Sequence, residues 1–261
     1  MVDVVYQKKF LRINQIWYPK DVKIAELLKQ KRKSDILFVH GTEKEETKGS
    51  FCGGNEFHTC INDLAITEEE IWAKINKNVK YEIRRSDKDD IEIKYYTGAD
   101  IKADHSLLRT FADIYEKMYR SKGMDVKLNM TAIDYYLQAD AICFSAILYK
   151  GEMIVFHSYI CDETDVRLLH SASCFRDESV DRNMMGRVNK RLHWDDIKYF
   201  KDKGVIRYDW GGISDFENPN GIDAFKLKFG GEKVTYYNVY AGNSLLGKTA
   251  VLAMKLLGKI K

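Results

Sequence analysis

The stretch from Tyr208 to Gly231 reads YDWGGISDFENPNGIDAFKLKFGG. It begins at the end of a predicted strand over residues 205–210, which the pair Gly211-Gly212 follows at once. Residues 221–229 are predicted to form a short helix that Gly230-Gly231 closes, since glycine is common just past a helix end. Another strand is predicted over residues 233–240. The stretch therefore predicts a strand-helix-strand unit.

The elements upstream of this unit can be predicted from residue 90 onward. Strands are expected over residues 91–97, 141–149, 152–161 and 166–175, and helices over residues 105–120, 131–138 and 184–203. Asp104 and Thr131 are the expected helix N-caps. Hairpins together with helical crossovers predict an α/β fold with a mixed central sheet and helices on both faces.

The first part of the chain gives weaker patterns. They indicate a basic helix over residues 20–33, strands over 35–40 and 57–64, and a loop over 49–55. Thr67 and Glu70 form a capping box, because each side chain can satisfy a backbone amide at the helix start. A helix is expected from there to about Asn78.

Composition excludes several classes of protein. The net charge of +3 over 261 residues is too small to predict nucleic acid as a bulk partner. The first thirty residues lack the apolar core of a signal peptide, and no apolar run approaches the roughly 20 residues of a membrane-spanning helix. The five cysteines are odd in number and include no C-x-x-C pair, which favours reduced thiols. We therefore expect a cytoplasmic protein.

The F-K-x-x-F-G-G pattern of residues 225–231, together with Tyr208-Asp209-Trp210-Gly211-Gly212, resembles the C-terminal signature of the FemAB-like branch of the GNAT superfamily. Residues 63–64, the Trp72 helix and residues 80–85 also resemble the segment by which this branch enters its transferase domain. The resemblance implies a GNAT-type fold and N-acyltransferase activity. It suggests a partial N-terminal subdomain over 1–85, a GNAT-like domain over 86–241 and a basic amphipathic helix over 242–261.

Acyl transfer to an amine needs a polarised donor carbonyl, a stabilised oxyanion and a deprotonated amine. By the resemblance, the donor lies where the parallel strands 166–175 and 205–210 splay apart, and Lys226 contacts its anionic or carbonyl end. The alternative for Lys226 is a solvent-facing lysine. Asp209 is expected to accept the amine proton or orient the acceptor; the alternative is a cap on the Gly211-Gly212 loop. Further expected donor-binding residues are Ser171, Ala172, Ser173, Arg182, Gly186, Arg187 and Asn189.

The acceptor side is predicted from a second group of residues. Arg84 and Arg85 can clamp a phosphate, although a solvated surface pair is the alternative. The other candidates are His170, Trp210, Gly211, Gly212 and Phe225. No metal is expected: a simple hairpin places His157 opposite His170, but Cys161 and Cys174 then fall opposite other residues and the four ligands do not converge.

Three readings of function remain open. The first is transfer from acyl-CoA to an amine of a cell-envelope glycan or peptidoglycan precursor, with no permanently bound cofactor. The second uses aminoacyl-tRNA, with the basic residues 20–33 touching RNA. The third is a non-catalytic protein that binds a glycan precursor. The C-terminal helix, with Lys248, Lys255 and Lys259 along one line, is expected to contact the inner membrane surface, the domain itself or a second subunit in a homodimer.

Overall fold

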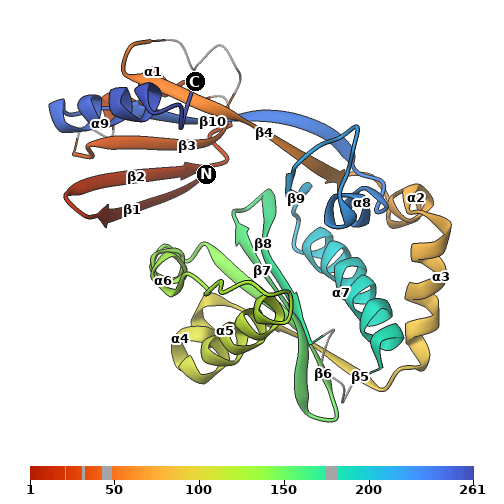
Figure 1. Cartoon of the computed structure of the whole chain (residues 1–261). Helices are drawn as coiled ribbons and strands as arrows, with labels where there is room; N and C mark the ends of the chain where they lie inside the picture. Colours follow the sequence, from red (N-terminus) through yellow and green to blue (C-terminus); the bar gives the residue numbers. More distant parts are fainter. Residues whose placement is uncertain (21, 31–32, 43–48, 175–180) are drawn as a thin grey trace. The chain divides into compact units, whose positions relative to one another are not determined.

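The computed structural model describes residues 1–20, 22–30, 33–42, 49–174 and 181–261 (Figure 1). The predicted helix over 20–33 and strand over 166–175 also include residues 21, 31–32 and 175, which lie outside the described residues. The strands are β1 (Val2–Lys8), β2 (Leu11–Trp17), β3 (Ile36–Thr42), β4 (Cys52–Asp63), β5 (Ile91–Tyr96), β6 (Ile142–Tyr149), β7 (Glu152–Cys161), β8 (Asp165–Ser173), β9 (Arg207–Ile213) and β10 (Glu232–Gly242). The α-helices are α1 (Ile24–Gln30), α2 (Glu68–Lys74), α3 (Lys77–Arg85), α4 (Gly98–Ala103), α5 (His105–Arg120), α6 (Met130–Gln138), α7 (Arg182–Asp202), α8 (Gly221–Leu227) and α9 (Leu245–Leu256).

The chain forms two compact units that interleave in sequence. The first contains residues 1–59, 212–218 and 233–261, and the second contains residues 60–211 and 219–232. This grouping differs from the predicted boundaries after residues 85 and 241, because the C-terminal segment pairs with the N-terminal one. Gly54 and Lys261 exchange two backbone hydrogen bonds of 3.0 Å. Residues 49–55, predicted as a loop, therefore include the start of strand β4.

The first unit is a sheet in the order β1-β2-β3-β10-β4, with β2 and β3 parallel and β3 and β10 antiparallel. Alternate residues of β3 serve two cores. Leu37 and Val39 pack with residues of α1, whereas Ile36 and Phe38 pack with residues of α9. Since successive strand side chains point to opposite faces, α1 and α9 cover opposite faces of this sheet.

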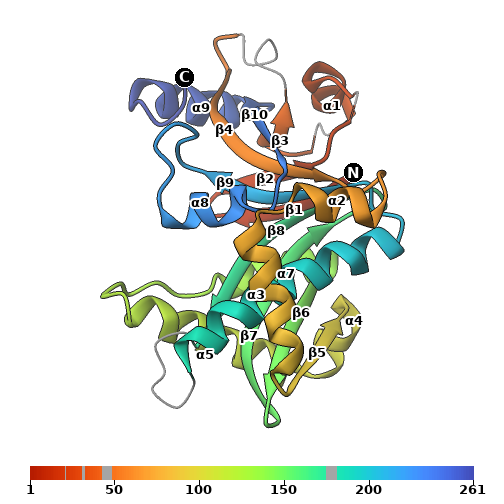
Figure 2. The same ribbon diagram turned by 90° about the vertical axis from the view of Figure 1, so that its right-hand side faces the viewer.

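The second unit carries the strand order β4-β9-β8-β7-β6-β5. Strands β5 to β8 are antiparallel neighbours, and β8 pairs with β9 in parallel. Helix α5 covers one face of this sheet and α7 covers the other (Figure 1), while α3 lies beside α7 (Figure 2). The predicted fold class, a mixed α/β sheet with helices on both faces, is confirmed.

The local signals for helix starts are mostly confirmed. Thr67 and Glu70 form the expected capping box at α2, and Asp104 caps α5. Helix α6 begins one residue before Thr131, because the side chain of Asn129 accepts the amide of Ala132 and is the actual N-cap. Strands β1 and β2 and helices α3 and α4 are not predicted from the sequence.

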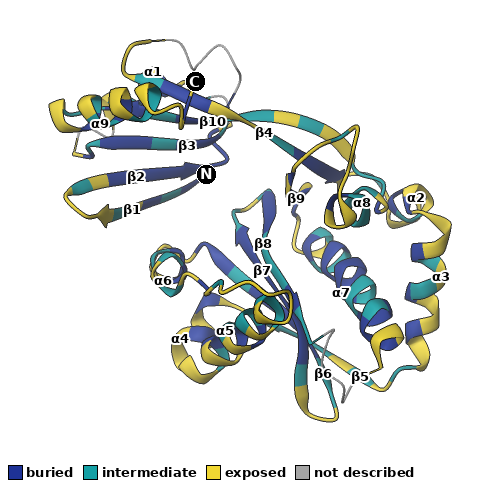
Figure 3. Cartoon of the chain, in the orientation of Figure 1, coloured by how far each residue is buried: buried dark blue, intermediate teal, exposed yellow. Residues whose placement is uncertain are grey.

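Helix α7 is buried along most of its length (Figure 3). Its buried residues include polar ones, His193, Asp195 and Asp196, as well as apolar ones. A buried polar group must find partners in the protein, so these residues point to a hydrogen-bonded network inside the second unit. Among the residues that the structure describes, no helix combines the length and apolar character needed to cross a membrane.

Candidate active site

Strands β8 and β9 pair over a short distance and then separate. In the described chain their register runs from Asp165↔Arg207 to Arg167↔Asp209, while β8 continues to Ser173 beside β7. A β-bulge lies at the same place: Ser158 of β7 pairs with His170 and Tyr159 with Leu168, so Leu169 is an extra residue in β8. A bulge bends its strand and re-aims the side chains that follow. It therefore accompanies the predicted opening between the two parallel strands.

The bulge also corrects the predicted register. His170 lies opposite Ser158, and His157 lies opposite Ser171. The simple hairpin that placed the two histidines opposite each other is wrong because it took no account of Leu169. His157 and His170 now face opposite sides of the sheet.

The backbone of β8 offers two amides to the opening. The Cys174 amide donates to Ile154 O of β7 at 2.9 Å. Because successive amides of an extended strand point to opposite edges, the amides of Ser173 and Ser171 point away from β7, toward the β9 edge. The amide of Ala172 points toward β7. Two of the three predicted amides thus have the direction that stabilising a donor oxyanion requires.

Charged side chains gather where the strands separate. Arg167 Nε lies 3.7 Å from Asp209 Oδ2, and both side chains are about nine-tenths buried. Asp209 Oδ1 also accepts the amide of Gly211 at 2.8 Å, which is the capping alternative for this residue. Lys226 of α8 is half-buried, and burial lowers its pKa, while the charges of Asp223 and Asp209 act in the opposite direction. The charge of Asp209 therefore acts on the pKa of Lys226.

Glycines of the motif allow close backbone approach. Gly211 has φ +70°, and a Cβ there would lie 2.8 Å from Leu168 O. Gly230 has φ +76°, and a Cβ there would lie 2.4 Å from Lys74 O of α2. Both contacts are with protein backbone. The positive φ values and the lack of space together explain why glycine occupies these positions.

His170 lies on the α5 side of the sheet. Its Nδ1 is 2.8 Å from Ser158 Oγ, and its ring meets Tyr115 of α5 edge-on at 5.4 Å. Burial lowers the pKa of His170 to about 4, so its imidazole is neutral near pH 7.

The predicted donor loop is helical. Arg182, Gly186, Arg187 and Asn189 all lie in α7, which begins at Arg182 because Asp181 caps it. Arg187 makes a two-bond contact with Asp89, with Nη2 to Oδ1 at 2.7 Å, so its guanidinium is engaged within the protein. Asn189 Oδ1 lies 3.1 Å from His157 Nε2 and faces the interior. Arg182 is exposed at the helix start.

The predicted acceptor residues are scattered. Trp210 is fully buried, and its Nε1 donates to Asn62 Oδ1 at 2.6 Å, so it is a core residue. Phe225 packs against the rings of His193 and Phe229. Gly212 belongs to the first unit and faces Phe57. Arg84 and Arg85 end helix α3, where the Arg84 guanidinium lies 5.4 Å from the Trp72 ring.

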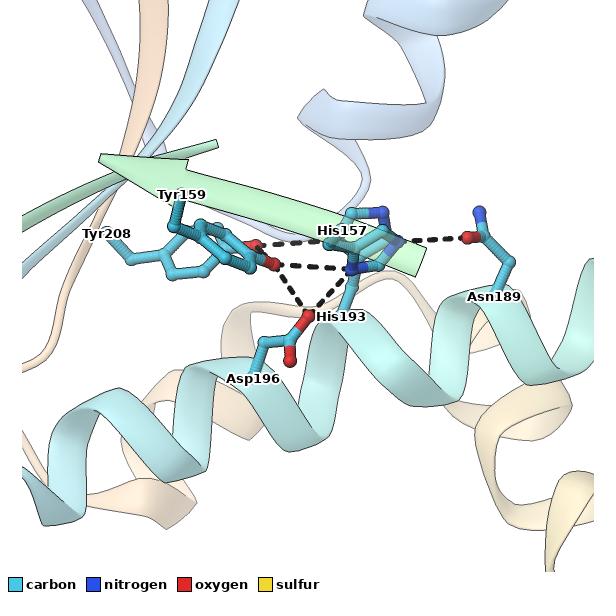
Figure 4. Close-up of polar contacts among 6 residues, drawn as sticks. All are labelled: His157, Tyr159, Asn189, His193, Asp196 and Tyr208. Atoms are coloured by element: carbon cyan, nitrogen blue, oxygen red, sulfur yellow. Dashed lines mark hydrogen bonds and ion pairs between the residues drawn. The ribbon is translucent and has the colours of Figure 1, made fainter. Parts of the chain in front are cut away.

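A buried hydrogen-bonded network lies behind the cluster, between α7, β7 and β9 (Figure 4). Asp196 Oδ2 accepts from Tyr159 Oη at 2.6 Å and lies 2.7 Å from His157 Nδ1. Burial, followed by the charge of Asp196, raises the pKa of both Tyr159 and Tyr208 well above the ordinary value. Both phenols therefore keep their protons. Since Tyr159 gives its proton to Asp196, Tyr208 is the donor in the 2.9 Å contact between the two hydroxyls.

The network connects to the cluster through His193. The rings of His157 and His193 stack at 3.9 Å, and His193 Nδ1 lies 3.4 Å from Tyr208 Oη. Burial lowers the pKa of His193 well below its usual value, with contributions from His157 and Lys226. Tyr208 directly precedes Asp209 in β9. The network therefore holds the β9 residue that directly precedes Asp209.

His157, His193 and Asp196 are close enough to be considered as metal ligands, since their ligand atoms lie within 4.8 Å of one another. Imidazole binds a metal through a lone pair in the ring plane. The two rings stack with centroids 3.9 Å apart and planes inclined by only 22°, so their lone pairs lie in two separate, nearly parallel planes, which does not favour convergence on one ion. We interpret the three residues as part of the hydrogen-bonded network.

Most of this network is not predicted from the sequence. Asn189 was expected near the donor, and His157 was considered only as a metal ligand. The signal that was available is the pattern of α7, where His193 and Asp196 lie on a helix whose apolar residues surround the axis. Polar residues on such a helix must be buried with partners.

A phosphate-loop pattern was also missed. Residues 242–249 read GNSLLGKT, which matches G-x-x-x-x-G-K-T between strand β10 and helix α9. In a phosphate-binding loop, the backbone amides surround the anion. Here the amides of Asn243 and Ser244 donate to Asp35 O, and the amide of Gly247 donates to Ser244 Oγ. The Asp35 carboxyl contacts that same Ser244 hydroxyl. This conformation offers an anion neither a ring of amides nor a favourable charge.

Comparison with known proteins supports the fold. No family model matches the chain, and no curated protein matches its sequence. A superposition on the crystal structure of FemX covers 98% of this chain and 86% of FemX, with a TM-score of 0.66 and 11% identity.

The chain has the fold of FemX. A similar fold occurs in the C-terminal domain of an Agrobacterium fabrum protein named as a lysylphosphatidylglycerol synthetase, with a TM-score of 0.59, 11% identity and coverage of 99% of this chain and 85% of that one. The structure of L-PGS from Bacillus licheniformis is also similar, with a TM-score of 0.56 and 13% identity. The superposition covers 98% of this chain and 85% of that one. The predicted likeness to the FemAB-like branch is thus confirmed at the level of the fold.

Proposed function

We propose that the chain is an N-acyltransferase that moves an acyl group from acyl-CoA onto an amine of a cell-envelope glycan or peptidoglycan precursor. The observation that carries the proposal is the opening between β8 and β9, with the amides of Ser171 and Ser173 directed toward it and the Arg167–Asp209 pair where it begins. The fold likeness to FemX supports the reaction class.

The proposed chemistry follows from these groups. The amine nitrogen attacks the thioester carbonyl carbon, a C–N bond forms, and the C–S bond breaks to release the CoA thiolate. The amides of Ser171 and Ser173 stabilise the oxyanion, and Lys226 contacts the anionic or carbonyl end of the donor. Asp209, held by Arg167, orients the amine. The amine loses one proton and the CoA thiolate takes up one, so no net proton is released.

The test offers a panel of acyl-CoAs with amino-sugar nucleotides and muropeptide precursors, and transfer is followed by mass spectrometry. Lys226→Ala should lower kcat/KM by about a hundredfold, since it removes a charge from a site where charge develops. Lys228→Ala is the matched control, because Lys228 is exposed directly after the end of α8. Equal rates in the two variants would remove Lys226 from the mechanism.

A second candidate keeps the fold and uses aminoacyl-tRNA as the donor. The likeness to FemX favours it, because it extends over nearly the whole chain. Charged tRNA is therefore offered in a parallel reaction. Transfer from tRNA alone would replace the acyl-CoA proposal, and tight binding of a precursor without any transfer would indicate a non-catalytic protein.

A further inference from the structure

Helix α9 is fixed on the first unit through one face. Val251 is fully buried there and packs with Ile13, Ile36 and Ile260. Gly247 passes so close to the neighbouring chain that a Cβ there would lie 1.7 Å from Asp35 O. Contact this close leaves the helix no freedom to rotate on the sheet. The face that α9 turns away from the sheet is therefore set by the fold.

That outward face is apolar. Leu245, Leu252 and Leu256 are 81%, 40% and 80% exposed and follow one another at i, i+7 and i+11, which places them on one side of the helix. Leu246 and Leu257 lie beside them and are 43% and 70% exposed. We call these five residues the outer leucine face. Figure 3 colours several parts of α9 as exposed. Clustered exposed leucines mark an interaction surface more often than isolated ones do.

The chain segment that carries this face has charges of one sign. Residues 233–261 contain five lysines and neither aspartate nor glutamate. Lys255 Nζ donates to the carbonyls of Gly49 and Cys52, and Lys248 lies over the Phe51 ring, so these two flank the helix on its docked side. Lys259 and Lys261 are exposed just beyond the helix end.

We propose that the outer leucine face inserts into an anionic lipid surface, with the C-terminal lysines at the level of the lipid headgroups. An apolar helix face with basic residues beside it binds such surfaces by burying apolar area and by attraction to anionic lipid. Charge favours this occupant over a second copy of the chain. A symmetric contact would bring two lysine-rich segments without acidic partners together.

The experiment measures binding of the full chain to vesicles by flotation. One set of vesicles is pure phosphatidylcholine, and the other contains phosphatidylcholine and phosphatidylglycerol in equal amounts. We expect binding to the anionic vesicles, weakened by added salt. Leu245→Ser with Leu256→Ser should lower the partition coefficient by roughly tenfold or more, because two leucines no longer enter the lipid.

The matched control is Val5→Ser with Phe10→Ser, which makes a similar change at two exposed apolar residues of the same unit outside α9. Circular dichroism checks that both double variants fold. Three outcomes would overturn the proposal: equal loss of binding in the two double variants, equal binding to neutral and anionic vesicles, or a leucine-dependent dimer in analytical ultracentrifugation without lipid. Vesicle binding is measured without any acyl transfer, so it is independent of the proposed reaction.

Discussion

The buried network gives the sharpest prediction, through the single change Tyr159→Phe. The residue is fully buried, and the change removes only its hydroxyl. Asp196 Oδ2 then loses the donor at 2.6 Å, and the Tyr208 hydroxyl loses the acceptor at 2.9 Å. A net hydrogen bond contributes about 1 kcal/mol, and a buried polar group left unsatisfied costs about 1–3 kcal/mol. We therefore expect the free energy of unfolding to fall by roughly 2–4 kcal/mol.

The assay is urea unfolding followed by circular dichroism. Tyr81→Phe is the control, because Tyr81 lies in the same unit and is 59% exposed, so its hydroxyl is hydrated in both states. That change should stay within about 0.5 kcal/mol. A double-mutant cycle with Tyr208→Phe should show coupling, because the second change removes the group that the first left without an acceptor. A cost for Tyr159→Phe no larger than that of Tyr81→Phe would refute this account of the network.

Two further predictions concern Gly211 and His170. Gly211→Ala should destabilise the protein by about 2–4 kcal/mol and Gly204→Ala by about 1–2 kcal/mol. Both glycines have positive φ, but only at Gly211 would a Cβ meet a carbonyl oxygen. Equal losses of stability in thermal unfolding would contradict the close-contact argument. For His170, burial lowers the pKa to about 4, so on acidification the unfolded chain takes up the proton first. Its contribution to stability is present above about pH 6.5 and is lost as pH falls toward about 4. His170→Gln should make urea unfolding less sensitive to pH in this window, and an unchanged dependence would contradict it.

Local structure was largely predictable because its causes lie within a few residues. The Thr67–Glu70 capping box begins α2, Asp104 begins α5, and the bounds of the strand now called β7 were predicted correctly. At α6 two residues could cap the helix start, Asn129 and Thr131. Thr131 was predicted, but Asn129 is the N-cap. The F-K-x-x-F-G-G pattern of α8 and its glycines indicated a fold that the comparison with FemX supports.

The candidate site was predictable only in part. Lys226 and Asp209 are predicted from the motif, and the charge of Asp209 acts on the pKa of Lys226; their catalytic roles stay predictions. The bulge at Leu169 was not predictable. The residues on either side of it still alternate between the two faces of the sheet, so the sequence pattern fits the pairing with the extra residue and the pairing without it. The extra residue decides which β8 residue lies opposite His157: it is Ser171, while His170 lies opposite Ser158.

The sequence by itself determined the order and type of most elements and the residues that carry charge near the motif, because capping, turns and periodicity are short-range. Which of those residues lie near one another depends on the folded chain. The tertiary structure also decided that α9 docks through Gly247 and turns its leucines outward, and that GNSLLGKT starts a helix with its amides already bonded. The physical reason is that these features depend on how closely segments distant in sequence approach one another, which no local pattern records.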